Sequence, residues 1–140
     1  PYLGAYTATK AAVVALSESW AGELEEKGIH VSVLCPAFVQ TRIHESERNR
    51  PAKYQSDLAH KPDEGSFANS TKQMVENGIE VSIVGKRVVE ALEDGEFYIF
   101  THPNYHSVMQ ERNAAIDVAF IKSAQSPLLE HIANQKIEMP

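Results

Sequence analysis

The chain has 140 residues, of which 43% are hydrophobic and 23% charged, a balance typical of one globular domain rather than a disordered segment. Its formal net charge of −6 argues against a general nucleic-acid-binding protein and against a polybasic membrane-surface protein. The single cysteine excludes an internal disulfide and no apolar run is long enough to span a bilayer, so we expect a cytoplasmic protein without membrane or nucleic-acid partners.

A helix is predicted over residues 7–27, where alanine, leucine and glutamate dominate and Gly28 stands just past the end, the usual place for a glycine that ends a helix. From Ala11 to Leu16 every side chain is apolar, so apolar groups face all sides of this part of the helix. We therefore expect the helix to pack on a sheet with one face and on another helix or subunit with another face.

A strand is predicted over residues 29–35, because Ile29, Val31 and Val33 alternate with other side chains and Pro36 ends the run. A helix, a glycine and then a strand form an α/β unit, and such units favour a parallel sheet.

A long, partly irregular segment follows this strand. Residues 42–50 and 66–76 are candidates for short helices, and residues 51–65 have the prolines and glycine of a loop. An insertion of this kind in a compact domain is often a lid or a binding loop.

A second clear helix is predicted over residues 81–94, and Gly95 closes it. Its apolar stripe consists of Val81, Val84, Val88, Val89 and Leu92. Residues 96–100 then predict a short strand, and Asn104 is a candidate cap for a further helix over residues 105–121. The candidate packing residues of that helix are Val108, Met109, Ala115, Ile116, Ala119 and Phe120.

Tyr6 and Lys10 are candidates for acid–base chemistry, because on a helix this spacing places two side chains on one face with Cβ atoms about 5–6 Å apart. A nearby ammonium favours the ionised form of a phenol, which suits the phenol to exchange a proton with a carbonyl or hydroxyl group. The same spacing is common on solvated helix surfaces, so the pair alone leaves a functional and a structural interpretation open.

The pair is followed by a wider pattern, in which Ala11-Ala12 begins the apolar helix, then come Gly28-Ile29-x-Val31-x-x-Leu34 and Pro36-x-x-Val39-x-Thr41. The joint pattern closely resembles the carboxy-terminal half of the short-chain dehydrogenase/reductase (SDR) family, specifically over residues 3–43 and more loosely to about residue 121. The resemblance implies an α/β fold, with the chain forming the carboxy-terminal part of a Rossmann-like, doubly wound parallel sheet. It also implies an NAD(P)-dependent oxidoreductase that interconverts an alcohol and a carbonyl.

The resemblance implies catalytic roles for Tyr6 and Lys10. Tyr6 would exchange the proton with the substrate oxygen. Lys10 would favour the ionised form of Tyr6 and hold the ribose hydroxyls of the nicotinamide, so both residues also belong to the implied cofactor site.

The implied cofactor is NAD or NADP, and the resemblance assigns it four more contacts. Pro36 and Ala37 would line the cofactor near the nicotinamide, Val39 would offer backbone contact to the carboxamide, and Thr41 would bond the carboxamide or a phosphate. Ala37 departs from the family, which usually has glycine there. No metal site is expected.

The resemblance also divides the chain, within a single domain, into four segments. Residues 1–41 would hold the catalytic helix, strand and cofactor loop, residues 42–79 the substrate lid, residues 80–121 a helix–strand–helix, and residues 122–140 a tail. The family's glycine-rich phosphate turn, its catalytic serine and the residue that separates NAD from NADP do not occur among these 140 residues. We therefore expect a piece of a longer enzyme that is inactive by itself.

The implied partners are a small alcohol or carbonyl substrate and identical subunits, joined as a homodimer or homotetramer through the helix of residues 7–27. Two alternatives stay open: a non-catalytic SDR-fold binding or scaffold protein, and a module that serves only subunit association. The presence of both Tyr6 and Lys10 speaks against the scaffold alternative.

Overall fold

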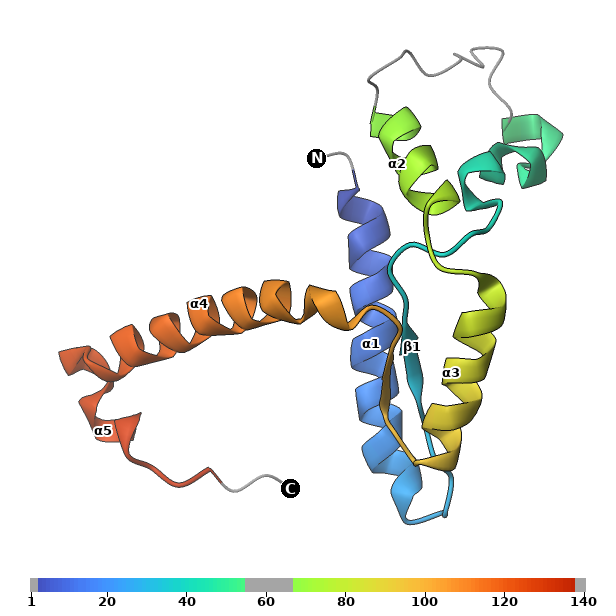
Figure 1. Ribbon diagram of the computed structural model, residues 1–140. Helices are drawn as coiled ribbons and strands as arrows, with labels where there is room; N and C mark the ends of the chain where they lie inside the picture. The colour runs from blue at the N-terminus through green and yellow to red at the C-terminus, as the bar shows by residue number, and fades with distance from the viewer. Residues whose placement is uncertain (1–2, 55–66, 138–140) are drawn as a thin grey trace. The chain divides into compact units, whose positions relative to one another are not determined.

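The structure is a computed structural model that describes residues 3–54 and 67–137, and the chain forms two compact units, Pro1–Thr101 and His102–Pro140. In the first unit the elements are α1 (Gly4–Glu25), β1 (Val33–Cys35), the 3-10 helices η1 (Ile43–Asn49) and η2 (Ala52–Tyr54), α2 (Phe67–Glu76), α3 (Val81–Glu93) and β2 (Tyr98–Phe100) (Figure 1). In the second unit they are η3 (Pro103–Tyr105), α4 (His106–Ala124), η4 (Pro127–Leu129) and α5 (Glu130–Ala133).

The two helices that lead into strands end in the same way, as the sequence predicts. Gly28 and Gly95 have positive φ angles of 67° and 70°, a conformation that costs glycine little because it has no Cβ. At the end of α1 the Gly28 N–H donates to the Glu25 carbonyl at 2.9 Å, and the next N–H donates to the Leu24 carbonyl at 3.2 Å. These bonds satisfy carbonyls that the end of a helix leaves open, and they turn the chain back toward the sheet.

Among the described residues the sheet has two parallel strands, which confirms the pairing predicted from the α/β order. Val33, Leu34 and Cys35 lie opposite Tyr98, Ile99 and Phe100. Both strands are shorter than predicted, since the patterns of residues 29–35 and 96–100 each yield three paired residues. A periodic sequence forms a ladder only where a neighbouring backbone accepts its hydrogen bonds.

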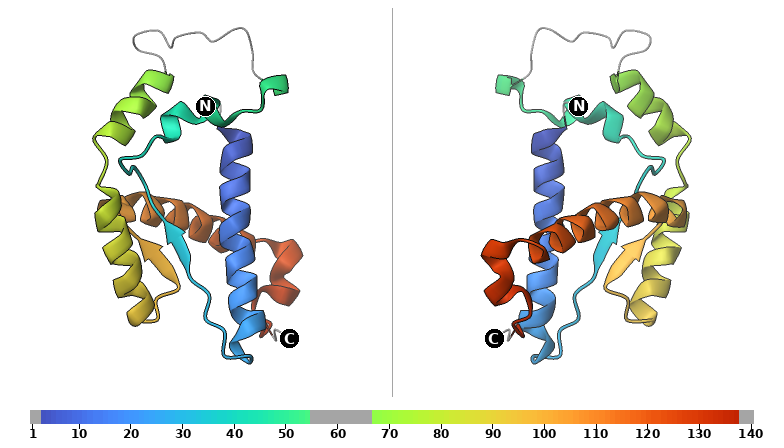
Figure 2. Two further views of the ribbon diagram at one scale, coloured as in Figure 1. Left: turned by 90° about the vertical axis from the view of Figure 1, so that its right-hand side faces the viewer. Right: turned by 90° about the vertical axis from the view of Figure 1, so that its left-hand side faces the viewer.

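The strands lie between α1 and α3, so the first unit has a helix, sheet and helix layer (Figures 1 and 2). Its core is small and is centred on Val33, Ile99 and Ala91, which are 4%, 2% and 0% exposed. Polar contacts join the layers: the Tyr98 hydroxyl donates to the Glu18 carboxylate on α1. Arg87 on α3 pairs with Glu96 just before β2.

Helix α1 has one face toward the sheet and one apolar face that stays open. Ser17 is buried on the inner face, and Val14, Ala21 and Leu24 beside it are half-buried. The neighbouring face carries Val13, Leu16 and Trp20, which are all exposed. The expectation that α1 packs on a sheet is confirmed, but the described residues do not cover its second apolar face.

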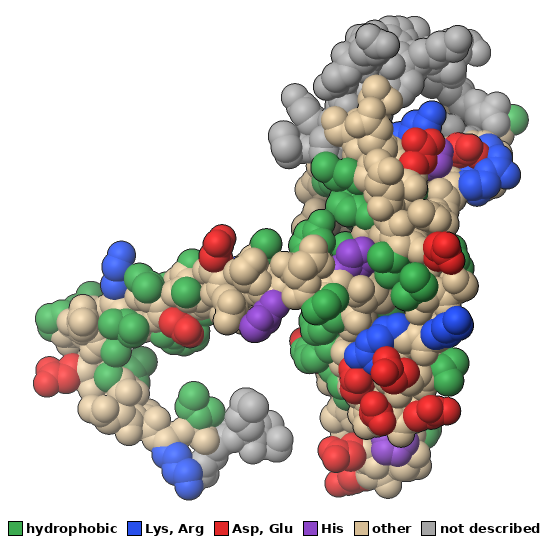
Figure 3. Space-filling model, viewed as in Figure 1, with side chains coloured by type: hydrophobic (Ala, Val, Ile, Leu, Met, Phe, Trp, Pro, Cys, Tyr) green, Lys and Arg blue, Asp and Glu red, His purple; other side chains and the backbone are tan. Residues whose placement is uncertain are grey.

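The second unit differs from its prediction in three respects. Helix α4 extends to Ala124, and its cap residue is Tyr105 rather than Asn104, which lies inside η3 and makes no capping bond. Its predicted packing residues are all exposed, and Figure 3 shows apolar side chains open along the helix. The apolar pattern therefore marks a helix that the described part of its own unit does not cover. Nowhere in residues 3–54 and 67–137 is a helix both long and apolar enough to cross a membrane.

Candidate active site

The first turns of α1 and the segment after β1 lie at the same end of the first unit. Helix α1 runs opposite to β1, so the helix begins where the strand ends, and both views in Figure 2 show this arrangement. In open parallel sheets, ligands bind just beyond the carboxyl ends of the strands. The fold thus places residues 4–10 and residues 36–41 at the end of the sheet where a ligand is expected.

Tyr6 and Lys10 share one face of α1, as their spacing predicts. The Lys10 Nζ lies 5.5 Å from the centroid of the Tyr6 ring, with the ammonium above the ring. Tyr6 is 51% exposed, so the residue is accessible to a ligand and to solvent. The pair therefore combines a proton-carrying phenol with a fixed positive charge and three N–H donors at the open end of the unit.

The segment after β1 is held by a second segment of the chain that lies forty residues away. Val39 forms an isolated parallel bridge with Ile79. The Ile79 N–H donates to the Phe38 carbonyl at 3.0 Å, and the Gln40 N–H donates to the Ile79 carbonyl at 2.9 Å. This bridge brings the two ends of the 42–78 segment together and fixes the backbone on both sides of Val39.

The other predicted ligand contacts of this segment are differently exposed. Ala37 and Val39 are half-buried, whereas Pro36 and Thr41 are exposed. The Thr41 hydroxyl oxygen accepts a hydrogen bond from the Ile43 N–H at 3.4 Å, which is long enough to be exchanged for a ligand. The structure thus places all four residues on one continuous stretch next to the bridge.

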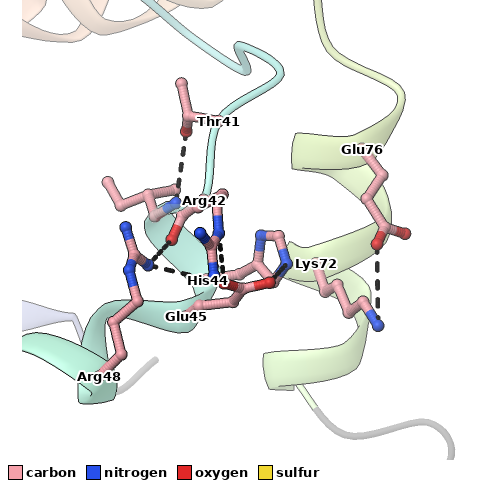
Figure 4. Close-up of polar contacts among 8 residues, drawn as sticks. Thr41, Arg42, His44, Glu45, Arg48, Lys72 and Glu76 are labelled. Carbon is pink, nitrogen blue, oxygen red and sulfur yellow. Dashed lines mark hydrogen bonds and ion pairs between the residues drawn. The ribbon is translucent and has the colours of Figure 1, made fainter.

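The 42–79 segment contains a polar cluster that is largely paired within itself (Figure 4). Arg42 Nε donates to Glu45 Oε2 at 2.6 Å, and Arg48 Nη1 donates to the Arg42 carbonyl at 2.6 Å. The hydrogen bond from Arg42, with its charge, holds the pKa of the Glu45 carboxyl below its ordinary value. The cluster therefore shapes η1 itself, which packs against α2.

His44 belongs to this cluster and carries the one buried side-chain polar atom that makes no hydrogen bond among the described residues. Its side chain is 16% exposed, and its Nε2 lies 3.7 Å from Glu45 Oε1. Its Nδ1 is buried and makes no hydrogen bond within the described part of the chain.

In the described part of the chain, Cys35 and the histidines form no group that could hold a metal ion. Burial raises the pKa of the Cys35 thiol, so at neutral pH it is a packed side chain rather than a nucleophile. Across residues 3–54 and 67–137, no three His, Cys, Asp or Glu side chains are grouped so that they could hold a metal ion.

Sequence reasoning gave no role to Gly78 and Ile79, although they hold the segment of the predicted ligand contacts. The available signal was a glycine two residues after a short helix, which is also consistent with an ordinary helix end. The contact of Gly78 and Ile79 with residues 38–40 becomes visible only in the structure.

Comparison with known proteins relates the chain to one family. The family model of the short chain dehydrogenases matches residues 1–52. A CLA biosynthesis dehydrogenase/reductase from Lactiplantibacillus plantarum is 32% identical over 117 residues, covering 80% of this chain and 41% of the relative. A C alpha-dehydrogenase from Sphingobium sp. (strain NBRC 103272 / SYK-6) is 34% identical over 113 residues, covering 81% of this chain and 36% of the relative.

The fold has a solved counterpart as well. The crystal structure of a short chain dehydrogenase/reductase from Burkholderia phymatum in complex with NAD superposes with a TM-score of 0.71 at 28% identity, covering 97% of this chain and 46% of that protein. The chain thus spans less than half the length of each of these three proteins.

Proposed function

Because this chain belongs to the short-chain dehydrogenase/reductase family, we propose that it supplies part of the catalytic domain of an NAD(P)-dependent oxidoreductase that interconverts an alcohol and a carbonyl. Residues 1–41 provide the catalytic helix and cofactor loop, residues 42–79 the substrate lid, residues 80–121 a supporting helix–strand–helix and residues 122–140 a tail. The observation that carries this proposal is the Tyr6–Lys10 pair on one face of α1, at the end of the sheet where α/β folds bind ligands.

Tyr6 moves the proton of the reaction. The phenol donates its proton to the carbonyl oxygen in the direction of reduction, and the phenolate accepts the proton of the alcohol in the direction of oxidation. The nicotinamide supplies the hydride chemistry when bound. Lys10 holds a positive charge beside the phenol ring, and its N–H groups bind the ribose hydroxyls.

The residues after β1 fit the nicotinamide end of NAD or NADP. Half-buried Ala37 and Val39 offer close backbone approach, Pro36 lies beside them, and Thr41 has a hydroxyl in a long, exchangeable bond. We assign the Val39 backbone to the carboxamide. The Thr41 hydroxyl bonds either the carboxamide or a phosphate. These 140 residues contain no glycine-rich phosphate turn, so the rest of the dinucleotide site belongs to sequence outside them.

The test of the proton role is Tyr6→Phe in the full-length protein. We expect kcat to fall about 10²–10⁴-fold, because loss of a general acid–base group costs that much. Folding stability should stay the same, since the ring is half exposed and only the hydroxyl is removed. Tyr105→Phe is the matched control, since Tyr105 is an exposed tyrosine of the second unit. Equal activity of Tyr6→Phe and wild type would contradict the proposal.

The 140-residue chain by itself should be inactive. It lacks the turn that binds the dinucleotide phosphates, so an NADH-linked assay with a panel of alcohols and carbonyls should show no turnover above a blank. Turnover by these residues alone that disappears in Tyr6→Phe would overturn this expectation.

The same assays separate the two alternatives. A scaffold protein that has kept the fold would bind NAD(H) without turnover in its full-length wild type, and Tyr6→Phe would change nothing. An association module would form oligomers and bind no dinucleotide. The shared face of Tyr6 and Lys10 favours the enzyme, because neither alternative needs it.

A further inference from the structure

Gly78 makes a backbone contact that no other residue type could make. A Cβ built on Gly78 would overlap the Phe38 carbonyl oxygen and would lie 2.5 Å from the Phe38 carbonyl carbon and 2.8 Å from the Val39 nitrogen. All three atoms belong to the main chain, so they cannot move aside by changing a rotamer. The absence of a side chain at residue 78 is therefore what allows the 38–39 peptide to lie where it does.

The segment around Gly78 cannot move away from the 38–39 peptide without breaking other contacts. Val75, one turn before it on α2, is buried at 4% exposure, and the Gly78 N–H donates to the Val75 carbonyl at 3.1 Å. On the other side, Ile79 is bonded to Phe38 and to Gln40. Gly78 is thus held between a buried helix end and the bridge.

The bridge also fixes the direction of the two peptide groups around Val39. Peptide groups are planar and trans, so the C=O and the N–H of one peptide point in opposite directions. The Phe38 C=O and the Gln40 N–H both point toward Ile79. The Val39 N–H and the Val39 C=O therefore point away from the bridge, and together they offer one donor and one acceptor, the pattern that a carboxamide binds.

We propose that Gly78 is a positioning residue for the nicotinamide: its contact with the 38–39 peptide, together with the Val39–Ile79 bridge, holds the Val39 N–H and C=O in place for the carboxamide. This inference rests on the proposed function, because Val39 contacts the carboxamide only if the enzyme binds a nicotinamide cofactor. It adds that the far end of the substrate lid sets the geometry of the cofactor loop.

The test compares Gly78→Ala with Gly85→Ala in the full-length enzyme. Gly85 lies inside α3 and a Cβ there meets nothing within 4 Å, so the control makes the same chemical change without the contact. Two probes are titrated by calorimetry: NAD, and ADP-ribose, which is NAD without its nicotinamide. If the wild type prefers NADP, the 2′-phosphorylated pair replaces them.

We expect Gly78→Ala to weaken NAD binding about three- to tenfold, the worth of one hydrogen bond, while ADP-ribose binds as in the wild type. Gly85→Ala should leave both probes unchanged. Equal losses for NAD and ADP-ribose would mean a general structural defect and would overturn the proposal, as would no loss for either.

Hydrogen exchange on the wild type keeps the inference testable if Gly78→Ala fails to fold. The Gln40 and Ile79 amides should be protected without cofactor, because both donate across the bridge. The Val39 amide should gain protection with NAD and not with ADP-ribose. A Val39 amide that is indifferent to NAD would overturn the inference. A wild type that binds neither probe would instead refute the proposed function.

Discussion

Tyr98 connects β2 to α1 through one hydrogen bond that spans 80 residues of sequence, from its hydroxyl to the Glu18 carboxylate. The bond requires the proton on the phenol, and it is the main reason that the pKa of Tyr98 is raised above its ordinary value, with burial and the negative charges of Glu18 and Cys35 adding to it. The contact thus stabilises the packing of the helix on the sheet only while Tyr98 is protonated.

This contact predicts a specific loss of stability in alkali. A group whose pKa is raised on folding contributes stability that is fully present below its unfolded pKa, about 10 for tyrosine, and that is lost as pH rises through the higher folded value. The thermal midpoint of the wild type should exceed that of Tyr98→Phe at about pH 8, and the difference should shrink toward about pH 11. Tyr105→Phe serves as the control. A difference that stays constant over this range would contradict the assignment.

Helices α1 and α3 end in the same backbone conformation, and each is followed by a strand of the sheet. At Gly28 and Gly95 the chain passes through the left-handed region, and the next residue in each case bonds back to a carbonyl five residues earlier. This shared helix end turns the chain after α1 and after α3 back toward the same sheet. The direction of β1 and β2 therefore depends on two residues that carry no side chain.

Gly28→Ala and Gly95→Ala should each lower the free energy of unfolding by about 1–2 kcal/mol, because alanine is strained in the left-handed conformation. Gly22→Ala and Gly85→Ala are matched controls inside helices, where the new Cβ has open space around it. These two variants should raise the free energy of unfolding by about 0.5–1 kcal/mol. Urea unfolding of the four variants measures both effects. Losses of equal size in all four would show that the positive φ is not the cause.

The whole first unit has a small core and a large open apolar surface. Val13, Leu16 and Trp20 lie on one face of α1 at 53%, 47% and 46% exposure, next to the face that packs on the sheet. Apolar side chains gathered on one helix face are typical of surfaces that other protein covers. We propose that this face of α1 takes part in a homodimer or homotetramer.

Leu16→Lys should shift the full-length protein toward smaller species in light scattering, because a buried lysine in an apolar interface is strongly disfavoured. Leu128→Lys is the control, since Leu128 is 83% exposed in the second unit. Circular dichroism of both variants confirms that they fold. A wild type that is monomeric at working concentration would refute this interface.

Local features of the sequence were enough to predict many structural elements of this protein. The helices, their glycine ends and the shared face of Tyr6 and Lys10 follow from periodicity, from the conformational freedom of glycine and from an i, i+4 spacing. Each of these depends on residues only a few positions apart. The parallel pairing also followed, because a helical connection between strands leaves little choice of direction.

Other features were decided only by the tertiary structure. The length of β1 and β2, the open face of α1, the Tyr98–Glu18 contact and the approach of Gly78 to the 38–39 peptide all join residues that are far apart in sequence. No local pattern predicts such a contact, because a strand pairing, a hydrogen bond or a close approach forms only once its distant partner is in place. The sequence by itself determined the local elements and the shared helix face of Tyr6 and Lys10, and the tertiary structure decided which distant contacts hold them.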